Sequence, residues 1–170
     1  QGCGTTRKYV RETVTMRIYD ITSCDVNNGE GIRVTLWVAG CRHRCPGCQN
    51  PETWDFNGGY AFDKEARDFL FNELGKSYID GLTLSGGDPL YSVDEIVPLC
   101  KEIKEKFPKK NIWLYTGFTL EEIQASPSLK KILPYIDVLI DGPYVEALRD
   151  VTLEFRGSSN QRIIRFNHET

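Results

Sequence analysis

The sequence lacks the features that mark membrane-spanning and nucleic-acid-binding proteins. None of its apolar runs approaches the roughly 18 residues of a membrane span. The first fifteen residues also lack the apolar stretch of a secretory signal. The net charge is −3, without the basic excess that nucleic-acid-binding domains show. We therefore expect neither a membrane nor a nucleic acid as a partner.

Methionine is nearly absent, because Met16 is the only one in the chain. We interpret the preceding segment, residues 1–15, as a tag remnant or an upstream extension. The chain has 170 residues, 40% of them hydrophobic and 26% charged, which is ordinary for a globular protein. This length suits one domain with a core of its own, and we place that domain at residues 16–170.

Cysteine is distributed in a way that argues against a disulfide framework. Cys41, Cys45 and Cys48 lie in one short segment, whereas the other three of the six cysteines are scattered. Disulfide frameworks belong to small secreted chains, and clustered cysteines in an intracellular protein more often bind a metal. We therefore expect a reducing, cytoplasmic location and a metal site in this segment.

The C-x3-C-x2-C spacing of this segment supplies three thiolates and no fourth. Structural zinc sites and ordinary iron–sulfur clusters both take four ligands, so three leave one metal position open for chemistry. Glycine at the start of the loop and a Pro-Gly pair within it favour a compact iron–sulfur cluster over zinc. The alternative is half of a zinc site that a distant His43, Cys24 or His168 completes.

Strand-like and helix-like segments alternate along the chain. The predicted strands are residues 32–38, 81–85, 112–116, 137–141 and 161–166, and the main predicted helices are 63–74 and 92–107, with a shorter one beginning at Thr119. This order predicts mostly parallel strands joined by crossover helices, in the α/β class. A closed eight-stranded barrel typically needs ~250 residues, so we expect a truncated, open (β/α) barrel.

Polar and glycine residues follow the predicted strands, at the edge where α/β proteins place their sites. Gly86 and Gly87 leave backbone groups open to a ligand, and Asp88 could receive an amino group. The alternative for this segment is a tight turn. Asp141 could contact a ligand or an ion, or form a turn. Arg156 could pair with a carboxylate in a site, or in a structural salt bridge.

Several motifs together resemble one known family. The three-cysteine loop resembles the signature of radical S-adenosylmethionine enzymes, and residues 28–33 are similar to the D-G-P-G-x-R segment that precedes it in activases of glycyl-radical enzymes. Further segments resemble the activases of anaerobic ribonucleoside-triphosphate reductase, in the same order: residues 48–54, 85–89, 112–117, 137–142 and 155–162. The resemblance covers the chain from about Met16 to Arg165.

This resemblance implies a fold, cofactors and a reaction. The fold is the open barrel of the radical S-adenosylmethionine type. A 4Fe–4S cluster on Cys41, Cys45 and Cys48 would bind S-adenosylmethionine at its open iron. The reduced cluster would split this cofactor into methionine and a 5′-deoxyadenosyl radical, which would take a hydrogen atom from a glycine of the reductase.

The resemblance also implies partners and site residues. The partners are an anaerobic (class III) ribonucleoside-triphosphate reductase and a low-potential electron donor such as flavodoxin. No catalytic residue is expected beyond the cluster ligands. The predicted cofactor-binding residues are Ser85, Gly86, Gly87, Asp88, Thr116, Asp141 and Arg156.

Two other functions remain open from the sequence. One is a different radical S-adenosylmethionine enzyme that acts on a small molecule. The other is a non-catalytic module that binds a metal or transfers electrons. Cofactor cleavage separates the last of these from the first two, because only an enzyme of the radical type forms 5′-deoxyadenosine.

Overall fold

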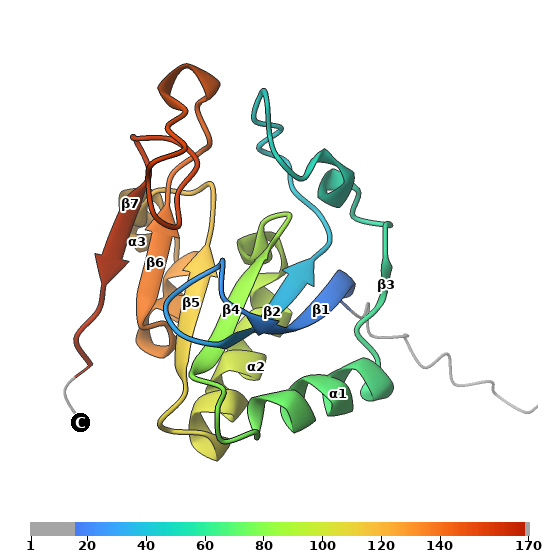
Figure 1. The fold of residues 1–170 in the computed structure, drawn as a ribbon. Helices are drawn as coiled ribbons and strands as arrows, with labels where there is room; N and C mark the ends of the chain where they lie inside the picture. The colour runs from blue at the N-terminus through green and yellow to red at the C-terminus, as the bar shows by residue number, and fades with distance from the viewer. Residues whose placement is uncertain (1–15, 169–170) are drawn as a thin grey trace, which may run out of the picture.

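One mixed sheet organises residues 16–168, the part of the chain that this computed structural model describes (Figure 1). The interpretation of residues 1–15 falls outside this range. Its strands lie in the order β3-β1-β2-β4-β5-β6-β7. They are β1 (Arg17–Asp25), β2 (Arg33–Val38), β3 (Tyr60–Ala61), β4 (Gly81–Gly86), β5 (Asn111–Tyr115), β6 (Val138–Asp141) and β7 (Arg162–Arg165).

Three α-helices and four 3-10 turns connect these strands. The α-helices are α1 (Lys64–Leu74), α2 (Val93–Lys106) and α3 (Leu120–Ala125). The 3-10 turns are η1 (Pro51–Trp54), η2 (Pro89–Ser92), η3 (Leu129–Tyr135) and η4 (Glu146–Leu148). No helix in residues 16–168 has the length and apolar character needed to cross a bilayer.

The prediction of an α/β fold with an open sheet is confirmed, but the expectation of mostly parallel strands is wrong at the edges. β2, β4, β5 and β6 pair in parallel, whereas β1 pairs antiparallel with β2 and β3, and β7 pairs antiparallel with β6. The link between β1 and β2 spans only residues 26–32, and a parallel crossover needs a dozen or more. The terminal strands β3 and β7 lie at opposite edges of the sheet.

β1 is the long strand that the sequence did not reveal. Its register against β2 shifts twice, between Ile18 and Asp20 and between Thr22 and Asp25. Such irregularities break the alternation of apolar and polar residues that identifies a strand in a sequence. The five predicted strands, by contrast, correspond to β2, β4, β5, β6 and β7 within one or two residues.

Side chains alternate between the two faces of the central strands. One face is apolar and packs against α1 and α2. Its core consists of Val34, Leu36, Val38, Leu82, Leu84, Ile112, Leu114 and Leu139 from the sheet, with Leu70, Leu74, Ile96, Leu99 and Ile103 from the helices. The other face carries polar residues on β2 and β4, such as Thr35, Thr83 and Ser85, and a second, smaller apolar cluster of Trp113, Val138 and Ile140 on β5 and β6. The polar part of this face lies next to the strand ends where the cysteines lie.

Local sequence signals set most helix ends. Asp63 caps α1 by accepting a hydrogen bond from the Ala66 backbone N–H, and Thr119 caps α3 in the same way. In α2, by contrast, the Ser92 side chain makes no capping bond. α2 begins at Val93 and includes Pro98.

A fully buried arginine fixes the loop between β1 and β2 on the polar face. Arg33 donates to the Thr83 hydroxyl oxygen at 2.7 Å and to the Leu82 carbonyl oxygen at 2.8 Å. Its guanidinium lies over the Trp113 ring, 5.3 Å from the ring centre. Burial lowers the pKa of Arg33 to about 10. Thr83 in turn donates to the Asn28 carbonyl oxygen at 2.6 Å, which holds the loop close to the site.

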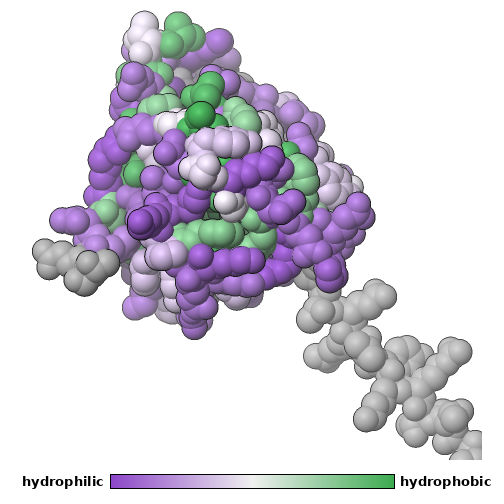
Figure 2. Space-filling model, turned by 60° about the horizontal axis from the view of Figure 1, so that its bottom comes forward, coloured by the Kyte–Doolittle hydropathy of each residue, from purple (hydrophilic) through white to green (hydrophobic). Residues whose placement is uncertain are grey.

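The carboxyl ends of the parallel strands β2, β4, β5 and β6 lie at one end of the sheet. The cysteine loop after β2 and the segment between β6 and β7 both extend beyond the same end of the sheet, at the top of Figure 1. The opposite end comes forward in Figure 2, where hydrophilic residues dominate and hydrophobic ones are scattered, as is normal for a water-exposed surface.

Arg162 ties β7 to β6 and α3. It stands opposite Asp141 in the β6–β7 register, and its guanidinium pairs with the buried Asp141 carboxylate and with exposed Glu121. Hydrogen bonds from Arg162 hold the pKa of Glu121 at about 2. Asp141 also accepts a hydrogen bond from the Leu120 backbone N–H at 2.8 Å, so its carboxylate joins three elements.

We predict that Arg162→Met destabilises the fold far more than Glu121→Gln. The first change leaves the Asp141 carboxylate, only 1% exposed, without its guanidinium partner, and an unsatisfied buried group costs about 1–3 kcal/mol. The second removes an exposed, solvent-screened partner and should leave the free energy of unfolding nearly unchanged. Urea denaturation at neutral pH measures both values. Equal effects would show that Asp141 does not depend on Arg162.

Candidate metal centre

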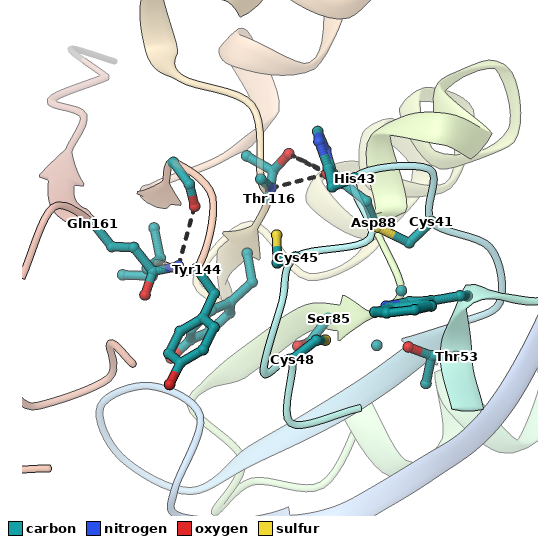
Figure 3. A pocket seen from close by; sticks show the side chains of 17 residues that line it. Cys41, His43, Cys45, Cys48, Thr53, Ser85, Asp88, Thr116, Tyr144 and Gln161 are labelled. Carbon is teal, nitrogen blue, oxygen red and sulfur yellow. Dashed lines mark hydrogen bonds and ion pairs between the residues drawn. The ribbon is translucent and has the colours of Figure 1, made fainter. Parts of the chain in front are cut away.

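The three clustered cysteines line one cavity of about 130 Å³ at the carboxyl ends of the central strands (Figure 3). Cys41, Cys45 and Cys48 come from the loop after β2, and Ser85 and Gly86 end β4. Thr116 follows β5, and Gly142 follows β6. All three thiols are free and partly buried. The segments that follow the parallel strands thus place three thiols and several backbone groups around one cavity.

Backbone hydrogen bonds hold the two ends of the cysteine loop. Gly40 N–H donates to the Thr53 carbonyl oxygen at 2.8 Å, and Cys41 N–H donates to the Trp54 carbonyl oxygen at 3.2 Å. At the far end, Cys48 N–H donates to the Cys45 carbonyl oxygen at 3.0 Å and closes a turn. That turn contains Gly47, whose φ of +77° lies in the left-handed region that favours glycine.

The surroundings of Cys41 and Cys45 favour the protonated thiols when no metal is bound. Burial, with a smaller contribution from the nearby Asp88 carboxylate, raises the pKa of Cys41 to about 11. Burial also raises the pKa of Cys45. Because metals bind the thiolate, loading this site must release protons. The positive charge of the bound metal would stabilise the negatively charged thiolates.

The predicted residue Asp88 lies beside the cysteines, but the protein already occupies its carboxylate. It is 1% exposed and accepts hydrogen bonds from His43 Nε2 at 2.7 Å, the Thr116 hydroxyl at 2.8 Å, Gly117 N–H at 2.9 Å and Leu90 N–H at 3.0 Å. These partners come from three different segments. The carboxylate therefore acts as a structural junction, and the expected contact with an amino group would compete with four donors.

The two glycines before Asp88 allow the turn after β4 to pack directly on the cysteine loop. Gly87 N–H donates to the Val38 carbonyl oxygen at 2.8 Å, and Asp88 N–H donates to the Gly40 carbonyl oxygen at 2.9 Å. A Cβ atom on Gly87 would lie 2.5 Å from the Gly40 carbonyl oxygen. Backbone cannot yield as a flexible side chain can, so packing alone requires glycine at this position.

A second cavity of about 440 Å³ adjoins the first along the polar face of the sheet. Ser85, Tyr115, Tyr144 and Gln161 line both cavities. The predicted residue Arg156 lines only the second one. Its Nη1 donates to the Gln161 carbonyl oxygen at 3.2 Å, and its buried Nε has no partner among the described residues. Arg156 therefore presents an unused donor beside the cysteine site.

The structure brings together most, but not all, of the predicted cofactor-binding residues. Ser85, Gly86, Gly87, Asp88 and Thr116 surround the cysteines, and Arg156 lies in the adjoining cavity. Asp141 is not among the residues that line either cavity, because Arg162 and α3 occupy its carboxylate.

Sequence reasoning did not single out Tyr115, Tyr144 and Gln161 as site residues. Tyr115 could have been found from its place in β5, since it shares a face with Trp113. Burial raises its pKa. Tyr144 and Gln161 lie in the segment between β6 and β7, which has no periodic pattern that could place them.

Comparison with known proteins supports an iron–sulfur site. Residues 27–164 match the family model described as a 4Fe-4S single cluster domain, a range that includes the cysteine loop. Three relatives are each named anaerobic ribonucleoside-triphosphate reductase-activating protein. The Pasteurella multocida (strain Pm70) relative is 44% identical over 84% of this chain and 92% of its own. The Enterobacteria phage T4 relative is 47% identical over 85% and 92%, and the Escherichia coli (strain K12) relative is 42% identical over 86% and 96%.

The chain belongs to the family of anaerobic ribonucleoside-triphosphate reductase-activating proteins. This confirms the resemblance that the ordered motifs indicated. The protein is therefore an activating enzyme, and its matched domain is one that carries an iron–sulfur cluster.

The residues present fit a cluster better than a zinc ion. None of the three distant candidates completes a zinc site: His43 bonds Asp88, His168 Nε2 lies 2.6 Å from the Ile136 carbonyl oxygen, and Cys24 is exposed on β1. Among the described residues, no three His, Cys, Asp or Glu side chains lie close enough to share one ion. A zinc site gathers its ligands on one ion, whereas each thiolate of a cluster binds a different iron. Three thiols spread around one cavity suit the second arrangement.

We predict that changing Cys41, Cys45 or Cys48 to Ala abolishes the iron–sulfur cluster, because no other cysteine of the described part of the chain lines the cavity and could replace the lost ligand. Anaerobic reconstitution followed by iron and sulfide analysis and visible absorbance measures the loss. Cys24→Ala is the matched control, since Cys24 is an exposed cysteine outside the cavity, and it should load normally. Full iron and sulfide in any of the three loop variants would contradict the assignment.

Proposed function

We propose that this protein activates an anaerobic ribonucleoside-triphosphate reductase by installing a glycyl radical on it. Among residues 16–168, three thiols and no fourth line the cavity at the strand ends, and this observation carries the proposal. Membership in the activating-protein family supports it. We infer that the fold is a truncated (β/α) barrel of the radical S-adenosylmethionine type, and the open α/β sheet supports this inference.

Cys41, Cys45 and Cys48 would hold a 4Fe–4S cluster through three of its irons. The chemistry that the bound cluster supplies is one-electron reduction of S-adenosylmethionine, which yields methionine and a 5′-deoxyadenosyl radical that takes a hydrogen atom from glycine. The protein's own part is to hold the ligands, to bind the cofactor beside the open iron, and to keep water from the radical.

The backbone of Gly86 and Gly87 and the Ser85 hydroxyl are the groups best placed to bind the cofactor directly. They border the cysteine cavity, and the glycines leave their backbone accessible. Asp88 and Thr116 would act on the cofactor through the segments they join. Arg156, with its free Nε, is placed to bind a carboxylate or a carbonyl oxygen in the adjoining cavity.

The substrate and the electron source remain to be supplied by partners. The cavities are open to solvent, so a glycine on a loop of another protein can reach the site. We propose a low-potential one-electron donor such as flavodoxin, because 4Fe–4S clusters of this type work at low potential. We also propose a cytoplasmic location, because cysteines without disulfide bonds are typical of a reducing compartment.

A small-molecule substrate is the second candidate. The adjoining cavity of about 440 Å³ lies in the size range of ligand pockets, which is the observation that favours it. Under this alternative, the cofactor would still be cleaved, but the radical would not pass to a reductase.

We predict that a glycyl radical forms on the organism's own anaerobic reductase when it is mixed anaerobically with this protein, a reductant and S-adenosylmethionine. Electron paramagnetic resonance should show a doublet, split by the glycine α-hydrogen, on the reductase. The signal should vanish when the reductase glycine is changed to Ala. If 5′-deoxyadenosine forms but the reductase stays radical-free, the small-molecule alternative is favoured.

A further inference from the structure

A histidine in the middle of the cysteine loop bonds the turn that follows β4. His43 lies between the first two predicted ligands, and its Nε2 bonds Asp88 Oδ2 at 2.7 Å (Figure 3). The flanking side chains Arg42 and Arg44 are exposed. Arg44 also has a φ of 48°, a left-handed conformation that is uncommon for a residue with a side chain. The guanidinium groups of Arg42 and Arg44 lie over the rings of Phe56 and Trp54, 5.3 and 5.8 Å from the ring centres, and these exposed cation–π contacts are weak.

Asp88 connects His43 to two strand ends. Its carboxylate follows β4, and it accepts hydrogen bonds from Thr116 and Gly117, which follow β5. Because the carboxylate is 1% exposed, water does not compete for these bonds. A buried carboxylate with several donors is a strong acceptor. The His43–Asp88 pair therefore links the cysteine loop to the ends of β4 and β5.

Aromatic neighbours hold the His43 ring in place. Phe118 meets it edge-on with centroids 4.6 Å apart, and Tyr91 lies 5.3 Å away. Gly117 packs against the ring so closely that a Cβ there would lie 2.6 Å from His43 Cδ2. Only 17% of the His43 side chain is exposed. The ring is fixed by packing as well as by its hydrogen bond.

We propose that His43 is a positioning residue: through Asp88, it holds the cysteine loop in the conformation that binds the cluster and orients the cluster toward the glycine turn of residues 86–87. The proposal rests on the proposed function only in requiring a cluster on this loop. It also changes the role of Asp88, which serves the cluster through His43 and does not contact the cofactor's amino group.

The test compares full-length variants after anaerobic reconstitution, without S-adenosylmethionine or reductase. Iron release to an Fe(II) chelator gives the retention of the cluster, and electron paramagnetic resonance of the reduced cluster gives its environment. We expect His43→Ala to release iron about tenfold faster, the scale on which partners of metal ligands act, with altered g-values. His43→Gln, whose amide nitrogen can reach the place of Nε2, should restore both readouts.

Arg42→Ala is the matched control, because it removes an exposed side chain of the same loop, with its weak cation–π contact on Phe56, and leaves His43 in place. It should behave as the unchanged protein does. If His43→Ala and Arg42→Ala give the same release rate and the same spectrum, the proposal is overturned. Failure of His43→Gln to restore the spectrum would equally count against it.

A second variant covers the case in which His43→Ala does not fold or load. Gly117→Ala keeps every loop residue and pushes the His43 ring from its place, so it should speed iron release and alter the spectrum. Normal retention and an unchanged spectrum in Gly117→Ala would overturn the proposal. If the proposed function is wrong, the result is different: the protein without substitutions keeps its cluster but does not cleave S-adenosylmethionine.

Discussion

Parallel pairing of β2, β4 and β5 is the constraint on which the site depends. The pairing sets Val38 beside Gly86 at the end of β2 and β4, so the segments that follow these strands meet at one edge. The cysteine loop follows β2, the glycine turn follows β4, and Thr116 follows β5. If this register shifted by one residue, polar and apolar side chains would exchange faces, and the strand ends would no longer meet. The apolar core beneath α1 and α2 holds the register in place.

Close packing of backbone joins these segments. Gly87 has no room for a Cβ beside the Gly40 carbonyl oxygen, so the turn after β4 and the start of the cysteine loop behave as one unit. The buried Asp88 carboxylate extends this unit to His43 and to the end of β5. These buried polar contacts hold the start of the cysteine loop against the ends of β4 and β5.

Much of this arrangement could be predicted from the sequence, for physical reasons that differ between elements. Short runs of apolar, β-branched and aromatic residues revealed β2, β4, β5 and β6, and the spacing of Cys41, Cys45 and Cys48 indicated a three-ligand cluster. β1 could not be found, because its two register shifts break the pattern. The role of Asp88 was also hidden, since His43 lies 45 residues away and Thr116 lies 28 residues away. Asp141 looked like a site residue at a strand end, but Arg162 on the neighbouring strand occupies it.

The central claim is that three cysteines leave one iron of a 4Fe–4S cluster open to S-adenosylmethionine. Mössbauer spectroscopy of the reconstituted, oxidised protein, with and without S-adenosylmethionine, tests it most directly. The account predicts that one iron is distinct from the other three, and that only its spectrum changes when the cofactor is added. Four irons that stay alike and do not respond to the cofactor would contradict the claim.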